Sequence, residues 1–379
     1  MRDIRGDFPA LTSGVAFFDA PGGTQTPASV GAAIADALTG PLSNRGAQTV
    51  GAQNAERIVV SCRSACARFL GAPSPDGIVF GRSATQVTYD LSRALAATWE
   101  AGDEVVVTRL DHDANVRPWV QAAARVGAIV RWADFDPATG ELGEIPLSAR
   151  TRLVAVTGAS NLIGTVPPVT DIAAAAHGVG AQVWVDGVHR TAHGAVDVSA
   201  MGADFYVCSP YKFLGPHLGV LAASPAALEP LRIDKLLPAT DAVPERFELG
   251  TLPYELLAGT VAAIGYLESL GWSAIEAHED RLRARIESGI SSIGGITCWS
   301  RARTRTPTLL LTFDDGRSCA DVSRHLASQQ IAAPSGSFYA LEPSRRLGLG
   351  DGGGLRIGLA PYNDDDDVDR LLAALDRPS

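Results

Sequence analysis

The chain has 379 residues, of which 46% are hydrophobic and 20% charged, and its formal net charge at pH 7 is −10. This length is too great for a single small core, so we expect an ordinary globular protein with one large and one smaller domain. The acidic balance argues against binding to nucleic acid or to an anionic membrane, although a local basic pocket for a phosphate group stays compatible with it.

The beginning of the chain carries no recognisable targeting signal. The segment MRDIRGDFPAL lacks an apolar h-region, and no run of about 18 apolar residues occurs in the sequence, so we expect neither secretion nor a membrane span. The cysteines form no CxxC pair, which favours free thiols in a reducing cytoplasm. They are Cys62, Cys66, Cys208, Cys298 and Cys319.

The first two thirds of the chain alternate short apolar runs with amphipathic stretches of helical length. This alternation predicts an α/β fold whose large domain, residues 17–251, contains a mainly parallel seven-stranded sheet. In such a sheet the functional side chains lie at the carboxyl ends of the strands. The expected strands are residues 78–80, 104–108, 128–132, 153–157, 182–186, 204–208 and 219–223.

The character of the sequence changes after Gly250 and Thr251. We expect residues 252–379 to form a smaller α+β domain, against which residues 1–16 pack as an N-terminal arm. This region has two helical stretches followed by alternating strand and helix patterns, at residues 254–269, 276–289, 308–313, 319–328 and 355–363.

Lysine is rare in this chain, and one lysine occurs between two turn signals. Of the 32 basic residues only Lys212 and Lys235 are lysines, and Lys212 lies in SPYKFLGP, directly after the apolar run DFYVC. A lysine amine in a dry pocket can lose its proton and attack a carbonyl to form a Schiff base, whereas arginine stays protonated. Lys212 is therefore a candidate for a covalent cofactor link, with an exposed surface lysine as the alternative.

A Schiff-base cofactor such as pyridoxal phosphate also needs a phosphate site, a partner for its ring nitrogen and a stacking ring. Ala84 and Thr85 begin a helix after a strand, where free amides bind phosphate, although SAT is also an ordinary helix cap. Asp186 ends the strand VWVD, where a lone carboxylate needs a cation; an Asx turn is the alternative. His112 could stack on the ring or lie in a surface loop, and Asn161 could bond the phenolic oxygen or serve a turn.

One histidine pair offers a metal-binding alternative. His189 and His193 are spaced four residues apart, with Asp186 as a conceivable third ligand. The sequence lacks a convincing fourth ligand and an HExxH glutamate, so we expect no metal.

Seven motifs occur in the order and spacing of the class V aminotransferase family, and within it the chain resembles the cysteine desulfurase and selenocysteine lyase branch. The likeness spans residues 17–370, and the motifs are SATQ, DHDANVRPW, SNLIGT, VDGVH, DFYVCSPYKFLGP, FELGT and LRIGLAPYN. The resemblance implies a fold-type I enzyme that uses pyridoxal 5'-phosphate (PLP), acts on a small amino-acid substrate, and forms a homodimer with active sites shared between subunits.

The resemblance also implies roles for individual residues. Lys212 would form the Schiff base and act as the base, Asp186 would pair with the pyridine nitrogen, and His112 would stack on the ring. Arg356 would bind the substrate carboxylate, at a site that the loop of Arg45 also borders. The other contacts to the cofactor would come from Asn161 and His189 at its phenolic oxygen, from Ala84, Thr85, Ser209 and Tyr211 at its phosphate, and from Thr251 at the phosphate of the neighbouring subunit.

The sequence departs from the desulfurase branch at three places. Tyr211 stands where histidine is usual and His189 where glutamine is usual, and both keep a hydrogen-bonding side chain. In desulfurases the loop before the last strand carries the cysteine that forms a persulfide, but here residues 331–343 read IAAPSGSFYALEP and contain none. Cys298 or Cys319 could act instead only with a different loop geometry; buried structural thiols are the alternative.

We therefore expect PLP chemistry at the α-carbon of an amino acid, with β-elimination that cleaves a C–S bond in cysteine or an S-substituted cysteine as the preferred reaction. A cysteine desulfurase that uses another thiol, an epimerase, an aminotransferase and a catalytically silent scaffold are the alternatives. A sulfur-acceptor protein is conceivable, although nothing in the sequence supports one. Arg45, Phe338 and Tyr339 suggest a substrate other than free cysteine.

Overall fold

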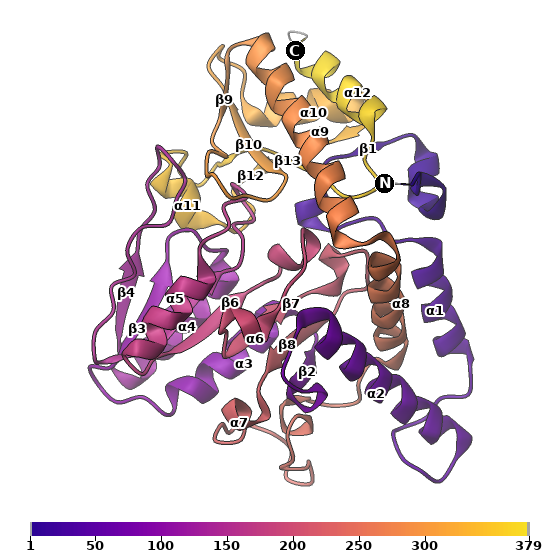
Figure 1. Cartoon of the computed structure of the whole chain (residues 1–379), viewed down its shortest axis with the longest axis vertical. Helices are drawn as coiled ribbons and strands as arrows, with labels where there is room; N and C mark the ends of the chain where they lie inside the picture. Colours follow the sequence, from indigo (N-terminus) through magenta and orange to yellow (C-terminus); the bar gives the residue numbers. More distant parts are fainter. Residues whose placement is uncertain (1, 377–379) are drawn as a thin grey trace.

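Seven strands form the central sheet in the computed structural model, which describes residues 2–376 (Figure 1). The strands are β2 (Ile78–Gly81), β3 (Glu104–Thr108), β4 (Ile129–Ala133), β5 (Thr151–Thr157), β6 (Gln182–Asp186), β7 (Phe205–Cys208) and β8 (Gly219–Ala223). Their order is β2-β8-β7-β6-β5-β3-β4, and all neighbours run parallel except β8, which is antiparallel to β2 and β7. The predicted α/β fold with a mainly parallel seven-stranded sheet is confirmed.

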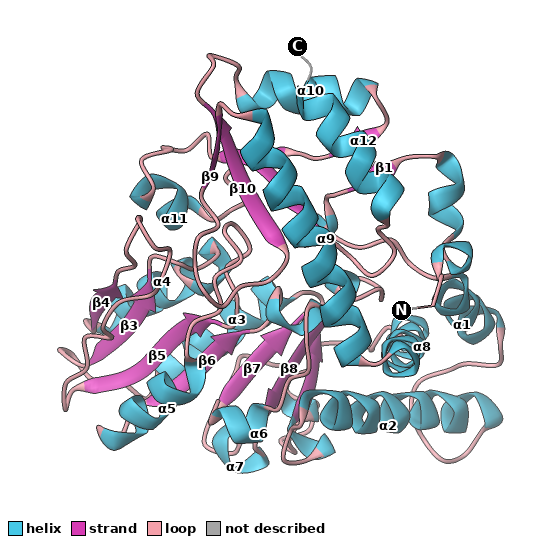
Figure 2. Cartoon of the chain, turned by 45° about the horizontal axis from the view of Figure 1, so that its top comes forward, coloured by secondary structure: helices cyan, strands magenta, loops and turns pink. Residues whose placement is uncertain are grey.

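The central strands are apolar on both faces because helices cover both faces of the sheet (Figure 2). Val106, Val154 and Val183 face one side, where they pack with helices α2 (Val50–Leu70), α5 (Val169–Gly178) and α8 (Tyr254–Leu270). Leu153 and Trp184 face the other side and pack with α3 (Ala84–Ala96) and α4 (Arg117–Val126). The remaining helices of this region are α1 (Ala28–Thr39), α6 (Val198–Met201) and α7 (Pro225–Leu228).

A smaller, antiparallel sheet lies beside the central one and has its own core. Its order is β12 (Ser335–Gly336), β13 (Gly354–Gly358), β10 (Thr308–Phe313) and β9 (Ile296–Cys298). Helices α9 (Trp272–Ile293), α10 (Cys319–Ser328) and α12 (Asp365–Asp376) pack on it, and α11 (Leu341–Arg346) follows β12. The helix predicted at 276–289 is longer in the structure, since it ends only at Gly271 and Gly294, which both have positive φ.

The N-terminal segment lies against the C-terminal part of the chain. Strand β1 (Ala16–Phe17) pairs with β11 (Ile331–Ala332), and the Arg5 guanidinium donates to the carbonyl of Tyr362 and to the Asp367 carboxylate. The exact domain boundaries, at residues 16 and 251, stay a prediction. None of the helices within residues 2–376 combines the length and the apolar character that crossing a membrane requires.

Candidate active site

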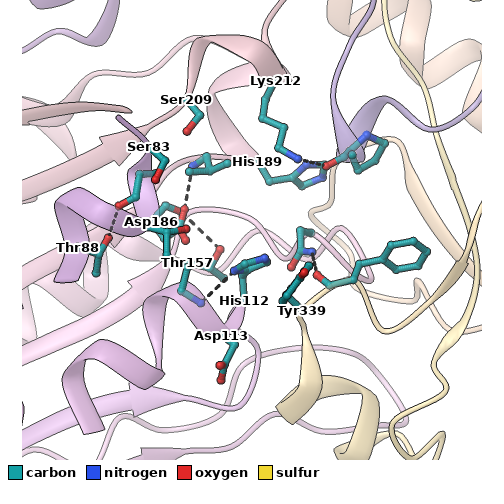
Figure 3. Close-up of a pocket in the computed structure, with 18 of the residues that line it drawn as sticks. Ser83, Thr88, His112, Asp113, Thr157, Asp186, His189, Ser209, Lys212 and Tyr339 are labelled. Atoms are coloured by element: carbon teal, nitrogen blue, oxygen red, sulfur yellow. Dashed lines mark hydrogen bonds between the residues drawn. The ribbon is translucent and has the colours of Figure 1, made fainter. Parts of the chain in front are cut away.

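A cavity of about 500 Å³ opens where the carboxyl ends of the central strands face the smaller sheet. The loops that follow β2, β3, β5, β6 and β7 all reach it, as the topology of a mainly parallel sheet predicts. Figure 3 shows how the side chains surround it. The predicted site residues that line this cavity are Ala84, Thr85, His112, Asn161, Asp186, His189, Ser209, Tyr211, Lys212 and Arg356.

Lys212 ends a single 3-10 turn, Pro210–Lys212, that follows β7. Its amine donates a hydrogen bond to the carbonyl of Pro21 and lies 4.6 Å from the centre of the Tyr211 ring (Figure 3). Burial, reinforced by the positive charge of Arg356, lowers the pKa of the amine to about 7. A large fraction of the amine is therefore unprotonated near neutral pH, as a nucleophile or a base requires.

Asp186 ends β6 and is buried in the cavity wall. One carboxylate oxygen accepts a hydrogen bond from the amide of Val188 at 2.9 Å, so the Asx turn suggested by the sequence is present. No arginine, lysine or histidine of residues 2–376 forms an ion pair with this carboxylate, and burial raises its pKa to about 6. A cationic group held in the cavity would relieve the cost of the buried charge.

A turn between β2 and α3 presents free backbone amides to the cavity. The Ser83 hydroxyl accepts a hydrogen bond from the amide of Gln86 at 3.1 Å, so the ordinary helix cap is also present. The amides of Ala84 and Thr85 have no acceptor within the described residues, and they lie at the positive end of α3, where a phosphate binds favourably. Gly219 permits this turn, because a Cβ there would lie 2.4 Å from the carbonyl carbon of Ser83.

His112 follows β3 and caps the short turn Asp113–Asn115. Its Nδ1 accepts a hydrogen bond from the amide of Ala114 at 3.0 Å, and its ring centre lies 5.7 Å from that of Tyr339 (Figure 3). Burial lowers the pKa of the imidazole to about 4, so the ring is neutral at pH 7. A neutral, fixed ring in the cavity can stack on a flat aromatic ligand.

Arg356 of β13 and Asn161 carry buried polar atoms that lack a partner. Arg356 Nη1 donates to the carbonyl of Asn161 at 3.0 Å, and its guanidinium carbon lies 3.7 Å from the centre of the Phe338 ring. Asn161 Nδ2 donates to the carbonyl of Phe338 at 3.0 Å. Arg356 Nε and Asn161 Oδ1 are buried and have no hydrogen-bond partner in the described part of the chain. Since both residues line the cavity, these atoms are available to a ligand there, and a guanidinium suits a carboxylate.

The segment between β12 and α11 is anchored over the cavity. Phe338 and Tyr339 have φ angles of 53° and 58°, in the left-handed region that side chains other than glycine rarely adopt. The Phe338 carbonyl accepts from Asn161, and the Tyr339 carbonyl accepts from the amide of Asp113 at 2.7 Å. These contacts hold both residues in a conformation that is unfavourable in isolation.

Two predicted site residues do not line the cavity of their own chain. Arg45 forms ion pairs with Glu56 at 2.8 Å and with Glu245 at 3.2 Å, so its charge is already neutralised. Thr251 is exposed, beyond the end of the segment Glu245–Phe247. The proposed contact of Thr251 with a neighbouring subunit, and any role of Arg45 there, stay predictions.

The structure adds cavity residues that sequence reasoning missed. Thr157 ends β5 directly beside Asp186 in the strand register, so the rule used for Asp186 could also have found it. Arg117 reaches the cavity with its charge paired to Asp113 at 2.9 Å, which only the fold reveals. Tyr89 lies one turn further along α3 than the predicted phosphate site.

The histidine pair is engaged in other contacts. The rings of His189 and His193 meet edge to face with centres 4.9 Å apart, and His193 Nδ1 lies 3.0 Å from a carboxylate oxygen of Glu279. Within residues 2–376, no group of three or more histidine, cysteine, aspartate or glutamate side chains is arranged to hold a metal ion.

The cavity residues fit PLP. Free amides at the start of α3 suit the phosphate, the unpaired Asp186 carboxylate suits a protonated ring nitrogen, and His112 offers a ring to stack. Lys212 has the lowered pKa that covalent attachment needs. Arg356 keeps a free, buried donor for the carboxylate of a substrate.

Comparisons with known proteins identify the family to which the chain belongs. Residues 16–371 match the family Aminotransferase class-V. A protein of Pseudomonas aeruginosa named as a probable cysteine desulfurase is 33% identical in an alignment of 397 positions that covers 98% of this chain and 97% of that protein. The apo cysteine desulfurase of Thermococcus onnurineus NA1 superimposes with a TM-score of 0.91 at 26% identity, covering 99% of this chain and 98% of that one. The cystine C–S lyase C-DES, solved with its product cysteine persulfide, shares the fold with a TM-score of 0.83 at 21% identity, covering 97% and 99% of the two chains.

Proposed function

We propose that this chain, which belongs to the PLP-dependent class V aminotransferase family, is a C–S lyase that acts on cysteine or an S-substituted cysteine. Its relatives place it among cysteine desulfurase-like enzymes. The proposed reaction is a β-elimination, in which the α-proton and the β-sulfur substituent leave the substrate. The sulfur departs as sulfide, a persulfide or a thiol. The released three-carbon enamine then reacts with water to give pyruvate and ammonia. Atoms and electrons balance without an oxidant or a protein thiol.

The absence of a cysteine at the cavity, among the described residues, carries this proposal. Phe338 and Tyr339 line the cavity in the segment where the desulfurase branch carries its persulfide-forming thiol. Cys319 lies at the start of α10 with its Sγ 3.6 Å from the carbonyl of Leu311, and Cys298 lies on β9. Burial raises the pKa of both thiols, which makes each a poor nucleophile.

Each of four cavity residues has a separate role in the proposed reaction. When bound, PLP supplies an electron sink for the electron pair left at the substrate α-carbon. Lys212 is the base that takes the α-proton, since its pKa is near neutral. Arg356 holds the substrate carboxylate through its free Nε, and Phe338 covers the guanidinium face and keeps water away from it. Asp186 keeps the charge of the ring nitrogen in place.

A substrate panel tests the proposal. PLP-loaded protein is incubated with L-cysteine, L-cystine and S-alkyl cysteines, and sulfide or thiol, pyruvate and alanine are measured. Pyruvate is expected in equal amount to the released sulfur compound, which is sulfide from cysteine, cysteine persulfide from cystine and a thiol from an S-alkyl cysteine. Alanine together with a protein persulfide would instead identify a desulfurase that uses another thiol, the alternative favoured by the names of the relatives. Exchange of the α-proton for solvent deuterium without product would identify an epimerase, and pyridoxamine phosphate an aminotransferase.

A homodimer located in the cytoplasm, with active sites shared between subunits, remains our prediction for the assembly. Leu236, Leu237 and Leu249 are exposed apolar side chains, which suits a surface that a second subunit covers. Sedimentation velocity of the PLP-loaded protein tests the dimer. A sulfur-acceptor protein has no support in the cavity, because none of the cysteines among residues 2–376 lines it.

A further inference from the structure

His189 lies between the two sheets, and one of its two ring nitrogens makes hydrogen bonds to threonines at the start of a strand of the smaller sheet. The residue follows β6, and its Nε2 lies 3.0 Å from the hydroxyl oxygens of both Thr306 and Thr308. Thr308 begins β10, and Thr306 precedes it by two residues. His189 also lines the PLP cavity, and its Nδ1 has no hydrogen-bond partner among residues 2–376. Nδ1 is therefore the nitrogen available to a ligand.

The threonine hydroxyls determine which nitrogen carries the proton. In a neutral imidazole one nitrogen donates and the other accepts. The buried Thr308 hydroxyl has Nε2 as its only acceptor within the described chain, whereas that of Thr306 also reaches the carbonyl of Gly164 at 3.4 Å. If Nε2 carried the proton, the Thr308 hydroxyl hydrogen would be buried without an acceptor, which is costly. Both hydroxyl hydrogens find an acceptor only when Thr308 donates to an unprotonated Nε2 and Thr306 donates to the carbonyl of Gly164, which places the ring proton on Nδ1.

The surroundings keep the His189 ring neutral and fixed. Burial and the nearby positive groups of His193, Arg356, Lys212 and Arg190 all lower the pKa of the imidazole well below its ordinary value. The His193 ring packs edge to face against it, and Glu279 of α9 holds His193 in turn from a buried position. The ring thus has one proton, and its plane is set by contacts from both sheets.

We propose that Thr308, assisted by Thr306, is a positioning residue that fixes His189 as the Nδ1–H tautomer, so that the imidazole presents an N–H donor to an anionic oxygen of bound PLP. Glutamine, the usual residue of the desulfurase branch at this place, offers an N–H donor without any tautomer. Histidine can replace it only if its single proton lies on the nitrogen that faces the cavity. The two threonine hydroxyls select the tautomer with the proton on Nδ1. This role does not depend on which bond of the substrate is cleaved.

The tautomer can be read directly by NMR on PLP-loaded protein in which histidine alone is labelled with nitrogen-15. The chain has only seven histidines, and the signals of His189 are those lost in His189→Gln. We expect a protonated Nδ1 and an unprotonated Nε2 in the wild type, loss of this single tautomer in Thr308→Val, and its restoration in Thr308→Ser. Thr312→Val is the matched control, since Thr312 is also on β10 but its hydroxyl accepts from Trp299 at 2.9 Å. A proton on Nε2 in the wild type, or an unchanged tautomer in Thr308→Val, would overturn the proposal.

The dissociation constant of PLP separates an effect on His189 from an effect on the fold. We expect Thr308→Val to weaken PLP binding by roughly three- to tenfold, the range that one hydrogen bond contributes. In the His189→Gln background the same substitution should weaken binding no further, because an amide donor needs no tautomer. An equal loss in both backgrounds would show that Thr308 acts through the fold alone and would refute the proposal. Neither measurement uses a substrate, so failure of the lyase reaction would leave this result unaffected.

Discussion

Replacing Asp186 with asparagine tests whether the cavity holds a carboxyl that destabilises the protein until a cation binds beside it. Burial raises the pKa of this carboxyl from 3.8 to about 6 in the folded, PLP-free protein. Between these two values the folded state binds more protons than the unfolded state. The contribution of Asp186 to stability is therefore fully present at low pH, and it is lost as the pH rises through about 6.

The size of this loss follows from the two pKa values. Integrating the linkage relation from pH 5 to pH 8 gives a loss of about 1.4 kcal/mol from Asp186 in the wild type. Asp186→Asn lacks this titration, so its free energy of unfolding relative to the wild type should rise by the same amount over that range. Asp186 is not among the groups that shift the pKa of His112, so the titration of His112 cancels in the difference. The charge of Asp186 raises the pKa of Lys212, so Lys212 titrates at a lower pH in the variant and adds to the difference.

Urea unfolding of the two PLP-free proteins at pH 5, 6, 7 and 8 measures this difference. We expect the two stability profiles to converge toward low pH and to separate toward high pH in favour of the variant. Repeating the series with saturating PLP should remove the separation, because a protonated ring nitrogen favours the carboxylate. Parallel profiles of the PLP-free proteins would show that the Asp186 carboxyl does not titrate in this range, and the reasoning about the site would then be wrong.

Three further tests, which use four variants, have distinct expected outcomes. In Lys212→Ala, borohydride should no longer fix PLP to the protein, which intact mass spectrometry detects; a retained mass increment would place the attachment elsewhere. Arg356→Met should raise KM for the amino acid by about tenfold or more, as expected for a charged hydrogen bond, with little change in PLP affinity; an unchanged KM would remove Arg356 from the substrate site. Glu248→Gln removes the shorter of the two ion pairs of the buried Arg63 and leaves it only Glu245, at 3.5 Å, so it should lower the free energy of unfolding by up to about 3–5 kcal/mol. By contrast Glu268→Gln, which breaks the exposed pair with Arg68, should cost less than about 1 kcal/mol. Similar losses in the two glutamate variants would contradict the role of burial.

Strand-end reasoning on the sequence was sufficient to bring the main cavity residues together. Lys212, Asp186, His112 and Asn161 each follow an apolar run, and in a mainly parallel sheet the ends of such runs converge at one edge. Local patterns carry this information, because each strand and the loop after it are contiguous in the chain. The roles of these residues toward PLP stay predictions.

Side-chain contacts between segments that are far apart in the chain could not be predicted from the sequence. In the sequence, Arg45 lies in a polar loop and resembles an unpaired cation. In the structure its charge is partly neutralised by Glu245, which is two hundred residues further along the chain. The hydroxyls of Thr306 and Thr308 meet His189 across more than a hundred residues, and nothing in the pattern TPT signals that partner. Such pairings depend on how the two sheets are placed against each other.

The tandem left-handed backbone at Phe338 and Tyr339 constrains how this enzyme could acquire sulfur-transfer chemistry. A thiol that shuttles sulfur must travel between the substrate and an outside recipient, so it needs a tether that can swing. Here both carbonyls are clamped, one by Asn161 and the other by the amide of Asp113. A cysteine introduced at position 338 or 339 would therefore be unable to move between the substrate and a sulfur acceptor. To introduce sulfur transfer, the whole segment from β12 to α11 would have to be replaced.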